Sequence, residues 1–172
     1  MAVSKRTQAF GPLTQAAPYA PARQRRGQAV PAGADPRPAI ALIAHDHEKV
    51  RLVDFAVCYR DVLARHRLIA TATTGRMLKE MVGLDVDCVR SGMAGGDRQI
   101  AEAVAGRGVA AVIFLVDPFH SRPHEPGLVP VMKACSLHDI PLATNISTAG
   151  AVLHALAFTE LQRASWPSLQ EK

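Results

Sequence analysis

The amino-acid sequence predicts an α/β fold: a single domain built on a doubly wound, five-stranded parallel sheet with helices on both faces. From residue 39 onward, short and continuously apolar runs alternate with longer amphipathic segments. Continuous apolar runs are typical of strands buried on both faces of a parallel sheet, and amphipathic segments are typical of the helices that cover it. Hydrophobic residues make up 48% of the 172 positions, which is enough for a sizeable core.

The first strand is expected at residues 39–45 (AIALIAH), where the apolar run is unbroken. Residues 48–66 follow as an amphipathic helix with one buried face. That face is expected to carry Val50, Val53, Val57 and Leu63. The remaining strands are expected at 67–72, 86–89, 109–117 and 140–145, and the remaining helices at 75–82, 97–107, 128–139 and 148–158.

Residues 1–38 are expected to be a disordered, basic and proline-rich extension. They carry six basic side chains against one acidic one, and six of the twelve prolines. Such a segment buries too little apolar surface to offset the entropy cost of ordering it. Its arginines also suit an organellar leader or a patch for an anionic partner, although only composition supports these readings. Residues 39–160 are expected to form the domain, and residues 161–172 a short tail.

The charge and hydropathy of the chain limit the kinds of partner that it is expected to bind. Outside the extension the chain has fourteen basic and fourteen acidic side chains, which argues against specific nucleic-acid binding. No apolar run approaches the roughly 20 residues that span a bilayer, and there is no secretory signal. We therefore expect a cytoplasmic protein with no membrane partner.

The cysteines show no paired spacing along the sequence. We therefore expect Cys58, Cys88 and Cys135 to be reduced core residues rather than parts of disulfides or of a zinc site.

Polar and glycine-rich residues gather where the predicted strands end. Carboxyl ends of parallel strands meet at one edge of a sheet, so these segments are expected to surround one ligand site. In chain order they are HDH (45–47), TATTG (71–75), SGMAGGD (91–97), DPFHSRPHEPG (117–127) and TN (144–145).

Several of these residues suit a phosphate. Hydroxyls and free N–H groups at a helix start bind anions, and a lysine on a neighbouring helix adds a cation. Simpler roles stay open for each residue: the threonines as a turn and cap, Lys49 as surface charge, His45 as a core histidine, Asp117 as the start of an Asp-Pro turn, and Asp97 as a helix cap. The candidate phosphate ligands are Lys49, Thr71, Thr73, Thr74, Ser91 and Gly92.

Six blocks of sequence follow one another between residues 39 and 158: AHDHEK (44–49), TATTG (71–75), SGMAGGDRQI (91–100), VIFLVDP (112–118), RPHEP (122–126) and IPLATNISTA (140–149). In order and spacing, these blocks resemble the methylglyoxal synthase family. The resemblance implies a carbon–oxygen lyase that converts dihydroxyacetone phosphate to methylglyoxal and inorganic phosphate. It also implies no metal or organic cofactor and a homo-oligomer, a hexamer.

The resemblance also implies a role for each site residue. Asp97 matches the catalytic carboxylate that removes a proton next to the carbonyl, with the preceding glycines admitting a small substrate. His124 matches the histidine that polarises the carbonyl oxygen or shuttles protons, and His45 another catalytic histidine. The substrate-binding set is His45, Lys49, Thr71, Thr73, Thr74, Ser91, Gly92 and His124, with Asp46 and Asp117 as supporting residues and no metal ligand.

One position departs from the family pattern. Many members carry a second aspartate in the motif PHDPD, where this chain reads PHEPG, so Gly127 replaces an acid. If the missing acid limits catalysis, Gly127→Asp is expected to raise activity.

Two other functions stay open: a non-catalytic regulatory module of the same fold that binds small ligands, and a metal-dependent hydrolase. The hydrolase would use ligands from His45, His47, Asp117, His120 and His124.

Overall fold

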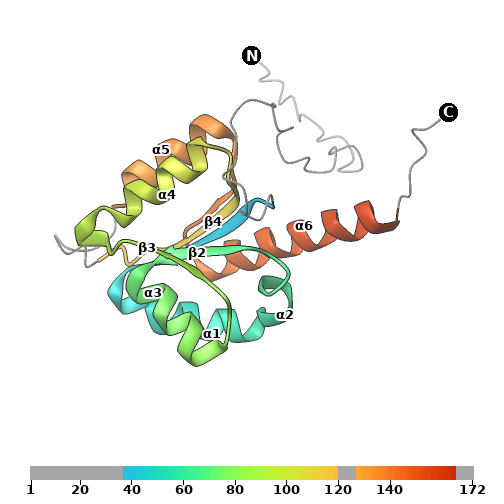
Figure 1. The fold of residues 1–172 in the computed structure, drawn as a ribbon, viewed down its shortest axis with the longest axis horizontal. Coiled ribbons are helices and arrows are strands. Elements are labelled where there is room, and N and C mark those ends of the chain that lie inside the picture. Colours follow the sequence, from blue (N-terminus) through green and yellow to red (C-terminus); the bar gives the residue numbers. More distant parts are fainter. Residues whose placement is uncertain (1–36, 120–126, 166–172) are drawn as a thin grey trace, which may run out of the picture.

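A computed structural model describes residues 37–119 and 127–165, and these residues form one α/β domain around a five-stranded, all-parallel sheet (Figure 1). The strand order across the sheet is β3-β2-β1-β4-β5. This confirms the predicted fold class. The strands are β1 (Ala39–Ala44), β2 (Leu68–Thr71), β3 (Asp87–Val89), β4 (Val109–Leu115) and β5 (Leu142–Ala143).

The helices alternate with the strands along the chain, as the hydrophobic pattern predicted. In the described residues, no helix is both long enough and apolar enough to cross a membrane. The last helix extends to Ser165, beyond its predicted end at residue 158. The α-helices are α1 (Lys49–Cys58), α2 (Arg60–Leu63), α3 (Ala72–Met77), α4 (Gly96–Ala105), α5 (Leu128–His138) and α6 (Ile146–Ser165). Short 3-10 turns cover η2 (Asp46–Glu48) and η4 (Gly92–Ala94), and the π-helical η3 (Leu78–Val82) continues α3.

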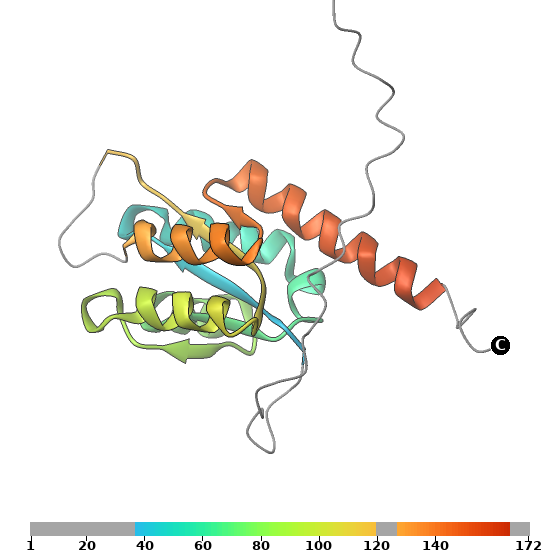
Figure 2. The same cartoon turned by 90° about the horizontal axis from the view of Figure 1, so that it is seen from above.

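The sheet separates two hydrophobic cores. Helices α4 and α5 lie side by side on one face, and the remaining α-helices cover the other (Figures 1 and 2). Strand β1 supplies both cores by alternation, because successive side chains of a strand point to opposite faces. Ile40 and Leu42 enter the core under α1, whereas Ala41 and Ile43 enter the core under α4.

The prediction of which side chains of the first helix are buried was wrong in part. Val53 and Leu63 are buried, but Val50 is 61% exposed and Val57 is 55% exposed. The segment contains a second apolar stripe with the same helical spacing, which includes Leu52 and Phe55, both buried. This stripe carries the larger side chains, so turning it toward the sheet removes more apolar surface from water.

The cysteines also differ from expectation. Cys135 is buried, and this burial raises the pKa of its thiol to about 11. Cys58 and Cys88 are exposed, contrary to the prediction that all three lie in the core. Cys88 lies on β3, which is an edge strand, and Cys58 is the last residue of α1. All three thiols are free.

The strand order places a switch point between β1 and β4. From β1 the chain adds β2 and β3 on one side, then returns to add β4 and β5 on the other. The connections therefore leave the sheet in opposite directions at this point, and a crevice opens beyond the carboxyl ends of β1 and β4. His45 directly follows β1, and Asp117 comes two residues after β4.

The folded domain is expected to lose stability in mild acid through His66. The Nε2 atom of His66 is buried without a hydrogen-bond partner among the described residues, and Nδ1 lies 3.5 Å from Glu160 Oε1. Burial, the largest cause, lowers the pKa of His66 below its usual 6.5. As the pH falls below 6.5, the unfolded chain takes up a proton that the folded chain resists, so stability present at pH 8 is lost.

The test compares melting temperatures at pH 8 and pH 5.5. His66→Gln removes the titration and should reduce the acid-induced decrease, whereas the same change at the exposed His154 should leave that decrease as in the parent chain. Equal pH dependence in His66→Gln and the parent would contradict the assignment.

Candidate active site

Four polar side chains are buried among the residues that the structure describes, and all four belong to the predicted site. Their exposed fractions are 4% for His45, 3% for Thr71, 2% for Thr74 and 8% for Asp117. Buried polar groups are uncommon and need hydrogen-bond partners, so their concentration at one edge of the sheet makes this edge the candidate functional site. Across the sheet, the residues that end or follow the strands are Ser91, Thr71, His45 and Asp117 in spatial order.

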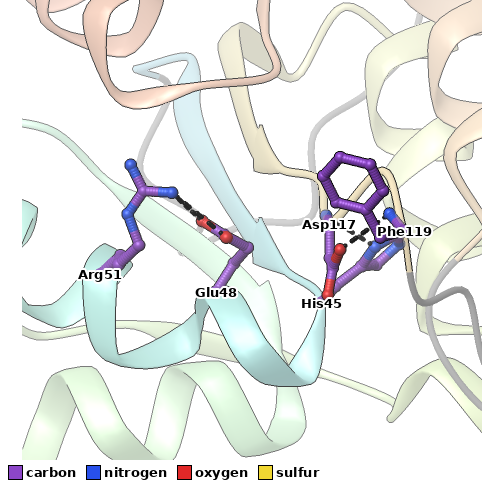
Figure 3. A network of polar contacts seen from close by, with 5 residues as sticks. All are labelled: His45, Glu48, Arg51, Asp117 and Phe119. Carbon is purple, nitrogen blue, oxygen red and sulfur yellow. Dashed lines mark hydrogen bonds and ion pairs between the residues drawn. The ribbon is translucent and has the colours of Figure 1, made fainter.

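The switch point joins His45 to Asp117 (Figure 3). The backbone N–H of Asp117 donates to His45 Nδ1 at 3.1 Å, and the edge of the imidazole meets Phe114 with ring centroids 5.2 Å apart. An Nδ1 atom that accepts a hydrogen bond carries no proton, so the neutral ring has its proton on Nε2. Asp117 Oδ1 accepts from the Phe119 N–H at 2.9 Å, which fixes the turn after β4. The site therefore presents Nε2 of His45 as a donor.

The threonines lie where β2 becomes α3. The Thr71 hydroxyl donates to the Thr74 hydroxyl at 3.2 Å, and both side chains are buried. Thr71 is the N-cap of α3, and the free N–H groups of the first helical turn begin at this position. Thr73 is exposed and is not part of the buried pair. This end of β2 supplies hydroxyl and backbone donors together.

Lys49 is held in place by Asp46. Its Nζ atom lies 2.6 Å from Asp46 Oδ1, and the lysine side chain is 17% exposed. Lys49 is the first residue of α1, immediately after the turn that follows β1. The pair thus fixes a largely buried cation four positions after His45, and the supporting role of Asp46 stays a prediction.

The glycines before Asp97 have a structural explanation. Gly95 has φ +82°, a left-handed conformation that favours glycine. A Cβ on Gly96 would lie 1.9 Å from the Arg90 carbonyl oxygen, so this position must lack a side chain. The N–H groups of Ala94 and Gly96 both donate to the Ser91 carbonyl, at 3.0 and 2.9 Å. The glycines close a tight loop that starts α4 and places Asp97 in its first turn.

Asp97 is also bound from outside its own helix. The backbone N–H of Gly127, the N-cap residue of α5, donates to Asp97 Oδ2 at 3.1 Å. Nothing in the sequence pattern indicated this contact, because Gly127 was considered only as a missing acid. His120 and His124 lie outside the described residues, so the predicted role of His124 stays a prediction. In the described residues, no group of three His, Cys, Asp or Glu is arranged to hold a metal ion.

A cavity of about 780 Å³ adjoins the switch point. Asp117 lines this cavity, whereas none of the predicted phosphate ligands does. Glu48 and Arg51 also line it, and they form an ion pair 3.0 Å long (Figure 3). Sequence reasoning missed Glu48 and Arg51 as residues at the edge of the site, and it included Phe119 only as part of the segment 117–127. The residues that line the cavity are His47, Glu48, Arg51, Val116, Asp117, Pro118, Phe119, Leu128, Thr144 and Asn145.

Asn145, which the sequence placed in the strand-end set, has a clear structural role. Its side-chain oxygen accepts from the Thr148 N–H at 3.0 Å and so caps the start of α6.

Comparison with known proteins agrees with this fold. Residues 51–144 match the family described as "MGS-like domain". Methylglyoxal synthase from Caldicellulosiruptor saccharolyticus is 44% identical over 137 residues, covering 77% of this chain and 95% of that protein. Methylglyoxal synthase from Thermus thermophilus is 49% identical over 115 residues, covering 67% of this chain and 91% of that protein. The crystal structure of methylglyoxal synthase from Elizabethkingia anophelis superposes with a TM-score of 0.66 at 38% identity, covering 68% of this chain and 77% of that chain.

The fold and the strand-end site thus define a doubly wound α/β domain of the MGS-like type. The chain belongs to the methylglyoxal synthase family. This confirms the resemblance seen in the six sequence blocks and, through the homologues, the enzyme class: methylglyoxal synthase, a lyase.

Proposed function

We propose that this chain converts dihydroxyacetone phosphate to methylglyoxal and inorganic phosphate, with Asp97 as the base. The observation that carries the proposal is the concentration of all four buried polar side chains of the described residues at the carboxyl edge of the sheet. The same edge carries the carboxylate of Asp97 and the ammonium of Lys49. Hydroxyls, backbone N–H groups and a cation suit a phosphate ester, and a single carboxylate suits proton removal.

The phosphate end of the substrate would be held by a cation and a set of neutral donors. Lys49, held by Asp46, supplies the positive charge, and the threonine turn at the start of α3 supplies neutral donors. Ser91 and Gly92, both half-buried at the end of β3, complete the proposed set. This arrangement leaves the carbonyl end of the substrate to face the residues that carry out the chemistry.

The reaction needs a base and a stabilised enediolate. Asp97 would remove a proton from the hydroxymethyl carbon next to the carbonyl, and the electron pair left on carbon would form the enediolate. Donors placed at the carbonyl oxygen stabilise the charge as it develops. His45, with its proton on Nε2, is one proposed donor, and His124 is the other.

Elimination then competes with isomerisation. When the bond from carbon to the phosphate oxygen is perpendicular to the enediolate plane, the electron pair expels phosphate and leaves the enol of methylglyoxal, which takes up a proton and ketonises. When that bond lies in the plane, phosphate stays attached. The product is therefore expected to depend on how the phosphate-binding residues orient this bond.

One assay tests the proposal. The purified full chain is incubated with dihydroxyacetone phosphate, and phosphate and dicarbonyl are measured together. Equal amounts of both support the proposal. Phosphate without dicarbonyl would indicate a hydrolase, which stoichiometric zinc in elemental analysis would support, and neither product would indicate a binding module.

Lys49→Met is expected to raise the KM for dihydroxyacetone phosphate about 10- to 100-fold, with a smaller effect on kcat. A hydrogen bond to a charged partner contributes about 1.5–3 kcal/mol, which corresponds to this change in affinity. Steady-state kinetics provides the measurement. Lys79→Met removes the same charge from an exposed position on η3 and should leave KM unchanged; an equal effect of both variants would show that only net charge matters.

We also propose that the enzyme is a homo-oligomer, a hexamer by family resemblance, and acts in the cytoplasm. Large apolar side chains exposed in the single chain support association: Val57 is 55% exposed, Met81 61%, Phe158 58% and Leu161 60%. The last two lie in the C-terminal half of α6, a helix whose end projects beyond the sheet (Figure 2).

A further inference from the structure

The proposed base is held by a contact between two neighbouring helices. Asp97 lies in the first turn of α4, and Gly127 is the N-cap of α5, which packs beside α4 (Figure 2). The Gly127 N–H donates to Asp97 Oδ2 at 3.1 Å across thirty positions of sequence. No other hydrogen-bond donor contacts this carboxylate in the described part of the chain. The contact therefore holds one oxygen of the carboxylate, Oδ2, in place.

A side chain at position 127 is limited by space rather than by backbone conformation, and the only close obstacle among the described residues is the end of the flexible Asp97 side chain. Its φ of −77° and ψ of 123° are extended values that any residue adopts. A Cβ at this position would lie 2.9 Å from Asp97 Oδ2, closer than real Cβ contacts, whereas its next neighbour, Pro130 Cδ, would be at an ordinary 3.5 Å. The Asp97 carboxylate is thus the one neighbour that a side chain at 127 would displace.

We infer that Gly127 is a positioning residue for catalysis: its bare backbone N–H holds Oδ2 of Asp97 and directs Oδ1 toward the substrate. This inference rests on the proposed function. It gives the departure from the family's acidic loop position a physical meaning, because the absent side chain leaves room for the carboxylate to approach the N–H. Catalytic geometry tolerates displacements of only about 0.5 Å, so a contact of this kind affects turnover strongly.

Gly127→Ala is expected to lower kcat about 10- to 100-fold while KM stays within about twofold, since the methyl group displaces the base and not the phosphate ligands. Gly108→Ala is the matched control. Position 108 precedes β4 at the opposite edge of the sheet, and its added Cβ would lie at an ordinary 3.5 Å from the Ala103 carbonyl oxygen. Kinetics are measured well below the melting temperature of each variant. The control should keep the parent kcat.

A double-mutant cycle separates positioning from general damage. If Gly127 acts through Asp97, adding Gly127→Ala to Asp97→Asn should not lower the remaining rate further. Unchanged kcat in Gly127→Ala, an equal fall in both backgrounds, or failure of Gly127→Ala to fold would each overturn the inference. A parent chain that forms no methylglyoxal would instead refute the proposed function, so the two failures are distinguishable.

The contact also reverses one expectation from the sequence. Gly127→Asp restores the acid common in the family, but its Cβ would meet Oδ2 of Asp97 and its carboxylate would add a second negative charge beside the base. Turnover is therefore expected to fall below that of Gly127→Ala, and a gain in kcat would contradict the positioning role.

Discussion

Asp97→Asn is expected to lower kcat for methylglyoxal formation by about 10²- to 10⁴-fold, the usual loss when a general base is removed. Asparagine keeps a side-chain oxygen that accepts the Gly127 N–H bond, so the loop geometry should persist. The amide nitrogen cannot take up the substrate proton, and chemistry is therefore the step affected. Single-turnover measurements with dihydroxyacetone phosphate give the rate of this step, and KM should change little.

Stability provides the control for this prediction. Asp97 lies in the first turn of α4, where a carboxylate interacts favourably with the helix dipole by about 0.3–1 kcal/mol. The asparagine variant should therefore melt only slightly below the parent. Asp54→Asn, at an exposed position of α1, should retain full activity. Near-normal turnover in Asp97→Asn would exclude this residue as the base.

The sheet was predictable from sequence because its strands are buried on both faces. Each of the runs at β1 and β4 is continuously apolar, a pattern that surface elements do not show. The face of α1 was not predictable to the same degree, because Val50 and Val57 compete with Leu52 and Phe55 for the same helical spacing. Only packing against the sheet decides between two such stripes.

The site, like the fold, has features that were predictable from sequence and features that were not. His45, Thr71 and Asp117 were predictable because polar residues that end or follow apolar strands of a parallel sheet must gather at one edge. The bond from Gly127 to Asp97 was not, since it depends on how closely α5 packs against α4. From the sequence, the glycines before Asp97 were interpreted as room for a small substrate. The left-handed φ of Gly95 and the close approach of Gly96 to Arg90 show that the loop itself needs them.

Gly96→Ala is expected to be among the most destabilising single methyl additions in this chain. The new Cβ would lie 1.9 Å from the Arg90 carbonyl oxygen and 2.8 Å from its carbonyl carbon, and backbone atoms cannot rotate away as a flexible side chain would. Forcing the loop apart should cost about 2–4 kcal/mol, which corresponds to a fall in melting temperature of about 5–15 °C. Thermal unfolding followed by circular dichroism measures this directly.

The neighbouring Gly95 gives a matched comparison, because glycine is needed there for the backbone conformation and at position 96 for space. Gly95 has φ +82° but nothing within 4 Å of its added Cβ, so Gly95→Ala should cost only the strain of a left-handed alanine, about 1 kcal/mol. Gly96→Ala should also lower kcat, since the displaced loop carries Asp97 with it, whereas Gly95→Ala should lose less activity. Equal melting temperatures in the two variants would contradict this prediction, because they would show that the loop yields to the added methyl group.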